Sequence, residues 1–252
     1  MALAGRHAFV TGGGRGIGRA IAAALARAGA AVTVIGRSEA PLRAAVVAGE
    51  AAGYGLADVT DPAEVQRQVA AAEAARGPIA ILVNNAGSVE SGPFSKADPS
   101  AFRRMWDVHV MGAVYATQAV LPGMVARGFG RIVNVASTAG LKGYAYVTAY
   151  CAAKHALVGL TRALAAETAT YGVTVNAVCP GYTDTDLVRD SIARVAARTG
   201  RVQAEVLAEY QKDAPIARLI RPEEVAAAVL YLCSPEAAAV TGTTLAVAGG
   251  EV

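Results

Sequence analysis

Thr11-Gly-Gly-Gly-Arg-Gly-Ile-Gly18 joins a short apolar segment, His7 to Val10, to a helix-like segment, Ile17 to Ala28. Glycines at such a junction let the backbone turn sharply and approach a pyrophosphate, whose charge the helix N-terminus stabilises. A second apolar segment, Ala31 to Ile35, follows at once, which predicts a βαβ unit with parallel strands. A bare tight turn would also use glycines, but the complete βαβ setting favours a nucleotide-binding turn.

The alternation of strand-like and helix-like segments continues to the end of the chain. Further strands are predicted at 54–56, 79–83, 131–135, 173–178 and 243–247, and further helices at about 40–50, from 61, at 99–126, 147–170 and 221–233. We expect Pro122 to disturb the last turns of the 99–126 helix. Seven strands with intervening helices predict one Rossmann-like domain over residues 1–252, a doubly wound parallel α/β sheet with helices on both faces. The charged segment at about 185–213 is expected to form a helical flap that covers the substrate.

Composition excludes several classes of protein. Hydrophobic residues make up 54% of the chain and charged residues 17%, unlike a disordered polymer. No stretch has the roughly 18 uninterrupted apolar residues of a membrane span, and residues 1–6 do not resemble a signal peptide. We therefore predict a soluble, cytoplasmic protein without a membrane partner. The net charge of +3 is too small to indicate nucleic-acid binding, and the three cysteines and three histidines have no metal-ligand spacing, so no metal is expected.

Four further motifs follow the glycine turn in order. They are Asn84-Asn85-Ala86-Gly87, Ser137, Tyr150-x-x-x-Lys154 and Pro180-Gly181. With Thr11-Gly-x-x-x-Gly-x-Gly18 they resemble the short-chain dehydrogenase/reductase family over essentially the whole chain. The resemblance is nearest to 3-oxoacyl reductases that act on acyl carrier protein or coenzyme A thioesters, and to 3-hydroxybutyrate dehydrogenases. It implies an oxidoreductase that moves a hydride between a nicotinamide cofactor and a carbonyl or secondary alcohol.

The chemistry of such a reaction fits three of these side chains. Tyr150 and Lys154 are four residues apart on a predicted helix and share a face. A nearby ammonium favours the phenolate, and a partly buried lysine next to a positive nicotinamide ring is expected to lower the pKa of the phenol from about 10. Tyr150 would then act as acid in reduction and as base in oxidation. Ser137 follows a strand, at the sheet edge where ligands bind, and would hold the substrate oxygen. Each alone could be a surface residue or a turn former, but their order after the glycine turn favours catalysis.

One position departs from the family pattern. The family usually has an asparagine in the long helix before the fifth strand, which is thought to hold a water that links the lysine to solvent. Here the matching residue is His109. Histidine also donates and accepts hydrogen bonds and titrates near neutrality. Our hypothesis is that His109 keeps the proton relay and adds a pH dependence; the alternative is a buried histidine that only fills space.

The end of the second predicted strand bears on the choice of cofactor. Enzymes that prefer NAD place an acidic residue there, but this chain has Gly36 followed by Arg37, with Arg15 in the glycine turn. Two guanidinium groups suit the 2′-phosphate of NADP, and Ser38 could add a hydroxyl. We therefore predict NADP(H) in preference to NAD(H), although solvated arginines, or one stacked on adenine, would also be compatible with NAD.

The resemblance implies the remaining cofactor contacts. Asp58 and Val59 would lie at the adenine, residues 85–87 beside the adenosine half, and Thr185 near the carboxamide. The full set of predicted cofactor-binding residues is Thr11, Gly12, Arg15, Gly16, Ile17, Gly18, Arg37, Ser38, Asp58, Val59, Asn85, Ala86, Gly87, Tyr150, Lys154, Pro180, Gly181, Thr183 and Thr185.

The substrate is less well defined by the sequence. Candidate lining residues are Ala139, Tyr144, Tyr182 and Leu187, which indicate a mostly apolar pocket. In the flap, Arg194, Arg198 and Arg201 fall near one helix face and could meet the phosphates of coenzyme A or acyl carrier protein, or could simply be solvated. We rank 3-oxoacyl or 3-hydroxyacyl thioesters first. The alternatives are other ketones and secondary alcohols (polyketide, cyclic or hydroxy acid), or a non-catalytic protein that senses NADP.

Two predicted helices bear on assembly. The segments around Trp106 and around 157–160 are apolar over more of their circumference than covering one sheet face requires. Exposed apolar helix faces tend to be subunit contacts. The family resemblance implies a tetramer built from these helices, and we predict a homotetramer.

Overall fold

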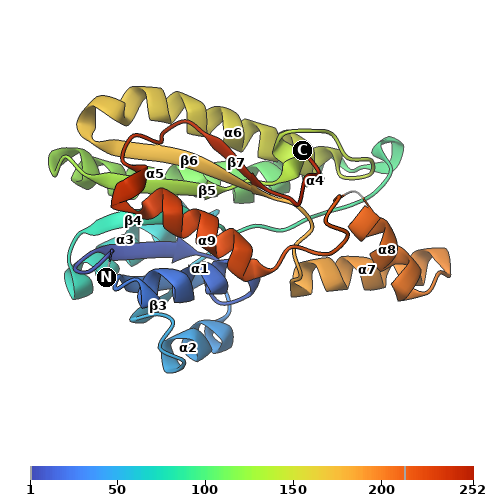
Figure 1. The fold of residues 1–252 in the computed structure, drawn as a ribbon, viewed down its shortest axis with the longest axis horizontal. Coiled ribbons are helices and arrows are strands. Elements are labelled where there is room, and N and C mark those ends of the chain that lie inside the picture. Colours follow the sequence, from blue (N-terminus) through green and yellow to red (C-terminus); the bar gives the residue numbers. More distant parts are fainter. Residues whose placement is uncertain (1, 213) are drawn as a thin grey trace.

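The computed structural model describes residues 2–212 and 214–252. Residue 1 and residue 213, the last residue of the predicted flap, lie outside the described residues. Its strands form one parallel sheet in the order β3-β2-β1-β4-β5-β6-β7 (Figure 1). The strands are β1 His7–Thr11, β2 Ala31–Gly36, β3 Gly53–Leu56, β4 Ile79–Asn84, β5 Gly130–Val135, β6 Val173–Pro180 and β7 Thr244–Val247. This arrangement confirms the predicted doubly wound, Rossmann-like fold.

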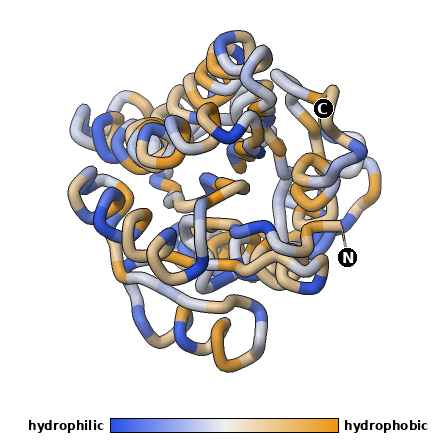
Figure 2. The backbone as a smooth tube through the Cα atoms, turned by 90° about the vertical axis from the view of Figure 1, so that its left-hand side faces the viewer, coloured by the Kyte–Doolittle hydropathy of each residue, from blue (hydrophilic) through white to orange (hydrophobic). Residues whose placement is uncertain are grey.

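Helices cover both faces of the sheet. They are α1 Gly16–Arg27, α2 Glu39–Val47, α3 Pro62–Arg76, α4 Pro99–Trp106, α5 Gly112–Ala126, α6 Thr148–Thr168, α7 Asp186–Thr199, α8 Gln203–Lys212 and α9 Pro222–Cys233. α1 and α9 pack together on one face, and α3, α5 and α6 pack on the other. Orange and blue stretches alternate along the helices in Figure 2, as expected where each helix turns one side to the sheet.

The strand sequences explain the two-sided core. β1, β4, β5 and β6 are buried along their whole length, as a parallel sheet covered on both faces requires. Side chains alternate between the faces: Phe9 packs with Ile35 beside α3 and α5, whereas Val10 packs with Val34 beside α1. These apolar runs fix β1 and β4 at the centre of the sheet, so the loops that follow them meet at one edge.

The predicted helix over residues 99–126 contains an irregularity. A π-helical turn, Asp107–Met111, separates α4 from α5. Such wide turns are frequent at functional sites because they shift the side chains of one turn relative to the rest of the helix. His109, the residue that departs from the family pattern, lies in this turn.

The expected disturbance at Pro122 is wrong. α5 continues past the proline to its end at Ala126, because Val120 and Met124 are buried on either side and hold the last turn in the core. Among the described residues, 99–126 is the stretch that is long and apolar enough, by length and composition, to cross a membrane. In this structure its apolar side chains pack against β1, β4 and β5, as in a core helix of a globular fold.

The flap segment forms two helices beyond the carboxyl ends of the strands. α7 and α8 project from the body of the molecule in Figure 1. They pack on one another through a small cluster of their own, formed by Ile192, Ala196 and Val206. Thr185 caps α7, and its Oγ1 accepts a hydrogen bond of 3.4 Å from the Val188 N–H. The flap is therefore built as a helix pair that is largely separate from the main core.

Candidate active site

The sheet brings the predicted motifs to one edge. Thr11 ends β1, Asn84 ends β4, Val135 ends β5 two residues before Ser137, and Pro180 ends β6. These four strands are neighbours in the sheet, and β1 and β4 flank the point where the strand order reverses. In open α/β sheets this point, outside the carboxyl ends of the strands, is where ligands bind.

The glycine turn forms a close-fitting cradle. Gly12 and Gly16 have φ angles of +64° and +49°, which residues other than glycine adopt only with strain. A Cβ atom at Gly18 would lie 2.3 Å from the Gly12 carbonyl oxygen. α1 begins at Gly16, so its first backbone N–H groups are available at the turn. Exposed backbone donors in a side-chain-free turn fit a pyrophosphate group.

Thr11 and Asn85 join the loops after β1 and β4. The Thr11 hydroxyl oxygen accepts hydrogen bonds from the N–H groups of Asn85 (2.9 Å) and Ala86 (3.0 Å). The Asn85 amide donates to the carbonyl oxygens of Thr11 (3.0 Å) and Gly12 (3.2 Å). Both side chains thus hold the shape of the cradle, and the amide donors of Asn85 are already in use there.

Ser137, Tyr150 and Lys154 lie together. Ser137 follows β5, and its Oγ accepts a 3.1 Å hydrogen bond from the Ala139 N–H. Its hydroxyl acts on the Tyr150 phenol in the direction that lowers the pKa of that phenol. Lys154, one turn of α6 after Tyr150, is buried, with its Nζ 5.5 Å from the centre of the phenol ring. That Nζ donates a 2.8 Å hydrogen bond to the Val135 carbonyl oxygen at the end of β5.

The protein's own groups do not make the Tyr150 phenol acidic, and the lowering expected from Lys154 together with a nicotinamide ring stays a prediction. Burial raises the pKa of Tyr150 to about 12 and outweighs the opposing effect of the Ser137 hydroxyl. The Lys154 ammonium, turned towards the Val135 carbonyl, does not lower it. Burial instead lowers the pKa of Lys154 to about 7. Low-dielectric surroundings favour the neutral form of both groups, so the site holds a protonated phenol beside an amine that changes charge near neutral pH.

His109 lies against this group from the π-helical turn. Its ring meets the Tyr150 ring edge to face, with centroids 5.2 Å apart. Its Nε2 is 2.7 Å from the Ser88 carbonyl oxygen, and its Nδ1 is buried without a partner among the described residues. A Cβ atom at Gly87 would lie 2.5 Å from the His109 ring, so the glycine of the Asn-Asn-Ala-Gly motif makes room for the imidazole.

The predicted titration of His109 near neutrality is also wrong. Burial, with a smaller effect from Lys154, lowers its pKa to about 3. The ring is therefore neutral at physiological pH and, because it faces a carbonyl, carries its proton on Nε2. Nδ1 is left as an acceptor. A small pocket of about 10 Å³ adjoins it, lined by His109, Lys154 and Asn84 among others. The Asn84 Oδ1 is likewise buried and unpaired in the described structure.

The residues predicted for the adenosine half are spread over the far side of the cradle. Arg37 is 78% exposed and lies 3.8 Å from an Asp58 oxygen. Ser38 directly precedes α2, and Arg15 directly precedes α1. Neither side chain makes a capping hydrogen bond to its helix. Val59 is buried against the α5 start and lines the small pocket beside His109, so its side chain faces the core.

The loop after β6 meets the glycine turn. A Cβ atom at Gly16 would lie 3.1 Å from the Thr185 methyl group. Thr183 is buried, and its hydroxyl donates a 3.0 Å hydrogen bond to the Gly181 carbonyl oxygen. Ile17 packs against the core at the start of α1. The structure therefore places the base of the flap directly beside the cradle.

Three tyrosines form a wall next to Ser137. The rings of Tyr144 and Tyr182 have centroids 6.2 Å apart, and Tyr182 contacts Tyr210 of α8 at 4.4 Å. Ala139 is buried in the turn after Ser137. Leu187, by contrast, is 45% exposed on α7. Of the four predicted substrate residues, the structure brings Tyr144 and Tyr182 into contact and leaves Leu187 apart on the flap.

Sequence analysis missed Glu251. Its side chain is only 1% exposed, and its Oε1 accepts a hydrogen bond from the Tyr144 hydroxyl and forms an ion pair with the Lys142 ammonium at 3.2 Å. Its Oε2 is buried without a partner in the part of the chain described. The Tyr144 oxygen also lies 2.7 Å from Thr138 Oγ1. Isolated carboxylates are rarely buried, but no spacing in the sequence joins residue 251 to residues 142 and 144.

The predicted basic rim of the flap is partly neutralised. Arg201 pairs with Glu205 and Glu209, at 3.6 and 2.9 Å. No ion pair of Arg194 or Arg198 occurs among residues 2–212 and 214–252. Within the same residues no cluster of histidine, cysteine and acidic side chains could hold a metal ion.

The fold and the site define the class of protein, a dinucleotide-binding oxidoreductase with a Rossmann-like sheet. Residues 6–196 match the short chain dehydrogenase family, and the chain belongs to this family. The predicted family is therefore confirmed. Its dehydrogenase and reductase relatives support an enzyme that transfers a hydride between a nicotinamide cofactor and a carbonyl or alcohol.

Relatives of several specificities are similar along the whole chain. The 2-(S)-hydroxypropyl-CoM dehydrogenase 3 of Xanthobacter autotrophicus is 44% identical over 247 residues, which cover 96% of this chain and 94% of the relative. A D-beta-hydroxybutyrate dehydrogenase of Rhizobium meliloti is 38% identical over 97% of this chain and 98% of its own. The crystal structure of an actinorhodin polyketide ketoreductase with NADPH is similar with a TM-score of 0.93, at 36% identity and covering 98% and 97% of the two chains.

We predict that His109→Asn leaves the shape of the activity profile between pH 6 and 9 unchanged. A ring with a pKa of about 3 has no charge to lose in that range. Stability should respond instead: the unfolded histidine binds a proton below about pH 6.5 and the folded one does not. Wild type should therefore lose up to about 1.4 kcal/mol per pH unit relative to His109→Asn as the pH falls from about 6 towards 4. Urea unfolding at several pH values measures this, and a rate transition near pH 7 found only in wild type would contradict it.

Glu251→Ala should lower the free energy of unfolding by about 1–3 kcal/mol, because two donors lose a charged acceptor in a buried setting. Urea denaturation is the measurement. Glu236→Ala, which removes an exposed carboxylate, is the control and should change little. A loss for Glu251→Ala no larger than that of the control would show that the Glu251 contacts do not hold the structure together.

Proposed function

We propose that this enzyme is an NADP(H)-dependent ketoreductase of 3-oxoacyl thioesters, in which Tyr150 donates the proton. The observation that carries the proposal is the grouping of Ser137, Tyr150 and Lys154 at the ligand-binding edge of the sheet, with the half-buried Tyr150 phenol beside the buried Lys154 amine. A pKa of about 12 keeps this phenol protonated at neutral pH, which is the form that reduction of a carbonyl requires.

Ser137 and Tyr150 would hold the carbonyl oxygen from two sides. When bound, the nicotinamide cofactor supplies the hydride to the carbonyl carbon. The Tyr150 hydroxyl gives its proton to the carbonyl oxygen, and the Ser137 hydroxyl donates a second hydrogen bond to that oxygen. Both donors are fixed before the substrate arrives, Ser137 by the Ala139 N–H and Tyr150 by its place on α6. Preorganised donors of this kind stabilise the charge that develops on the oxygen.

Lys154 and His109 would return a proton to Tyr150. With a pKa of about 7, the buried Lys154 amine exchanges a proton near neutral pH. His109 Nδ1 and Asn84 Oδ1, the two unpaired acceptors, border the small pocket that Lys154 also lines. A pocket of about 10 Å³ accommodates about one water molecule. We assign His109 the relay position on the way from Lys154 to solvent, in its neutral form.

The preference for NADP(H) rests on charge at the end of β2. Gly36 leaves no carboxylate at the end of β2 itself to accept from the ribose hydroxyls. The guanidinium of Arg37 is 78% exposed, and its long, exposed ion pair with Asp58, at 3.8 Å, leaves most of its N–H donors to meet a phosphate. Arg15 lies at the start of α1 on the same side of the cradle. The similar polyketide ketoreductase was crystallised with NADPH.

A thioester substrate rests on the shape of the site and on the relatives. The tyrosine wall and Ala139 offer an apolar surface beside Ser137, and Arg194 and Arg198 leave basic charge on the flap. A second candidate is a small secondary alcohol carried on CoM, favoured by the 44% identity to a 2-(S)-hydroxypropyl-CoM dehydrogenase. Following NADPH oxidation with acetoacetyl-CoA, cyclic diketones and 2-oxopropyl-CoM would separate these, and the highest kcat/KM identifies the substrate class.

Assembly and location complete the proposal. Trp106 is 47% exposed on the face formed by α4 and α6. We propose that these helices pair between subunits in a homotetramer, which light scattering after size-exclusion chromatography would test. The enzyme would work in the cytoplasm on a freely diffusing or carrier-bound substrate.

Tyr150→Phe should abolish reduction of every ketone tested, by at least about 10³-fold, because the proton donor is lost. Binding of NADPH, measured by fluorescence titration, should stay within about twofold, since the variant leaves the cradle intact. Retention of more than a tenth of wild-type activity would show that another group protonates the substrate.

Arg37→Gln should lower kcat/KM for NADPH by about tenfold or more, as one charge-assisted bond to a phosphate is lost. The value for NADH should change little, because that cofactor has no 2′-phosphate. Steady-state kinetics with both cofactors measures the ratio. An equal effect on the two cofactors would place Arg37 away from the 2′-phosphate.

A further inference from the structure

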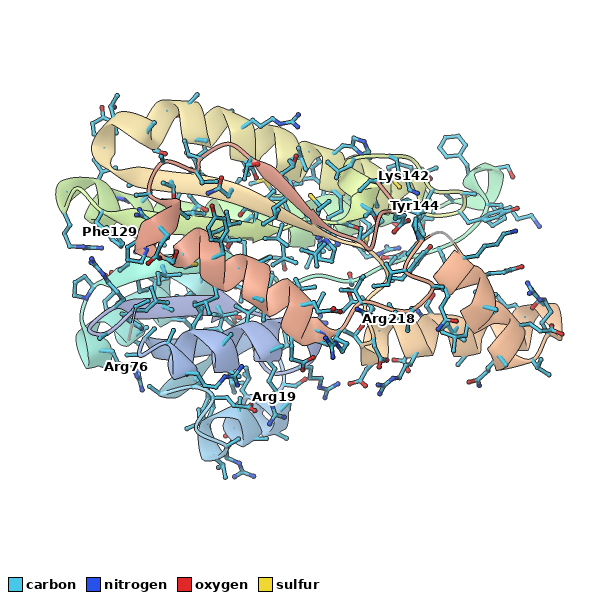
Figure 3. All side chains as sticks on the ribbon, in the orientation of Figure 1. Arg19, Arg76, Phe129, Lys142, Tyr144 and Arg218 are labelled. Atoms are coloured by element: carbon cyan, nitrogen blue, oxygen red, sulfur yellow. The ribbon has the colours of Figure 1, made fainter. Side chains whose placement is uncertain are left out.

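A second pocket lies at the opposite end of the sheet. Its volume is about 330 Å³, and its lining includes Arg6, His7, Arg76, Arg127 and Phe129. In Figure 3 Arg76 and Phe129 lie at one end of the molecule, and Lys142 and Tyr144 of the active-site region lie at the other. We refer to this pocket as the arginine pocket. It is more than thirty times the volume of the small pocket beside His109, which is about 10 Å³.

The arginine pocket is built at the amino edge of the sheet. His7 begins β1, Arg76 ends α3, and Phe129 directly precedes β5. The cradle, Ser137 and Tyr150 all follow the carboxyl ends of the same strands. The pocket is therefore separated from the proposed active site by the length of the sheet and is no extension of it.

The pocket carries positive charge without a matching negative charge. Three guanidinium groups line it, from Arg6, Arg76 and Arg127, and no acidic residue does. None of the three forms an ion pair within residues 2–212 and 214–252, whereas Arg19, Arg104, Arg189, Arg201 and Arg218 all do. Like charges gathered in one concave site repel one another, and an anion among them would relieve the repulsion.

Two of the guanidinium groups are held in place by the backbone. Arg76 Nη2 donates a 2.8 Å hydrogen bond to the Ala52 carbonyl oxygen, and Arg127 Nη2 donates a 2.7 Å bond to the Ile79 carbonyl oxygen. A guanidinium has five N–H donors, so each keeps others for a ligand. Donors fixed before binding cost less entropy to order.

Two guanidinium groups lie over the Phe129 ring. The Arg6 guanidinium lies 3.8 Å from the centre of its ring and that of Arg131 lies 4.4 Å from it. Arg131 is 5% exposed, and its Nε is buried without a partner in the described structure. Cations are attracted to the face of an aromatic ring. His7 adds no charge, because its ring nitrogens lie 2.7 Å from the Gly77 carbonyl and 2.9 Å from Thr33 Oγ1 and burial lowers its pKa.

We propose that the arginine pocket binds the phosphate group of a small phosphorylated compound. Planar guanidinium groups match the oxygens of phosphate in pairs, which a single rounded ammonium does not. The volume of about 330 Å³ leaves room beyond one phosphate for the remainder of the ligand. Arginine stays protonated over the whole physiological pH range. The positive charge of the pocket therefore does not change with pH in that range.

The test uses the full-length enzyme saturated with NADPH, so that the phosphates of the cofactor already fill the cradle. Inorganic phosphate and phenyl phosphate are titrated by calorimetry at constant ionic strength. Each should bind saturably at one site per chain. Tighter binding of phenyl phosphate would identify an organic phosphate as the ligand, and equal binding would identify phosphate itself; both results support the pocket.

Arg6→Gln and Arg127→Gln should each weaken phosphate binding by about tenfold, the size expected for one hydrogen bond to a charged group. The Arg6 guanidinium makes no hydrogen bond among the described residues, and its backbone hydrogen bonds to Leu3 and Ala31 are kept in the variant. The variant should therefore fold normally, and unchanged NADPH binding verifies this. Arg67→Gln is the matched control: it removes the same charge from the exposed face of α3, nine residues and about 13 Å along the helix from Arg76.

Two outcomes would overturn the proposal. One is the absence of any saturable phosphate binding to the NADPH-saturated enzyme. The other is an equal loss of affinity in Arg6→Gln, Arg127→Gln and Arg67→Gln, which would mean that phosphate responds to net charge rather than to this pocket. Failure here leaves the proposed ketoreductase activity untouched, because neither variant reaches the carboxyl edge of the sheet.

Discussion

The hydrogen bond from the Lys154 ammonium to the Val135 carbonyl is the contact on which the site depends. A buried amine without an acceptor would cost several kcal/mol, and the end of β5 provides the acceptor. This bond fixes the register between α6 and the sheet edge. Tyr150, one turn earlier on α6, is thereby placed over Ser137, two residues beyond Val135. Strand, helix and reacting groups are aligned by a single buried donor.

Burial decides the chemistry of the three titratable groups in the site. Tyr150 keeps its proton, Lys154 becomes a weak base, and His109 stays neutral, because desolvation has the largest effect on the pKa of each. Pairing of opposite charges, which the four-residue spacing of Tyr150 and Lys154 suggests, has the smaller influence. The amine uses its hydrogen bond on the backbone, and its charge is weakened by desolvation before it can act on the phenol.

Much of the fold and site follows from local pattern. The βαβ start, the seven strands and the order of the motifs place Thr11, Ser137 and Tyr150 at one edge, since parallel strands bring their carboxyl ends together. What the sequence could not show depends on packing between distant segments. Glu251 meets Lys142 and Tyr144 only through the fold, and the pKa values of Tyr150 and His109 depend on how much of the chain covers them. The π-helical turn around His109 likewise has no signature in composition.

The contact between Gly16 and Thr185 joins the cradle to the flap. A ligand seated on the cradle shares its border with the first residue of the flap, because Thr185 both touches the turn and caps α7. A substitution at Thr185 would therefore alter the border of the cradle and the N-terminal cap of α7 at the same time.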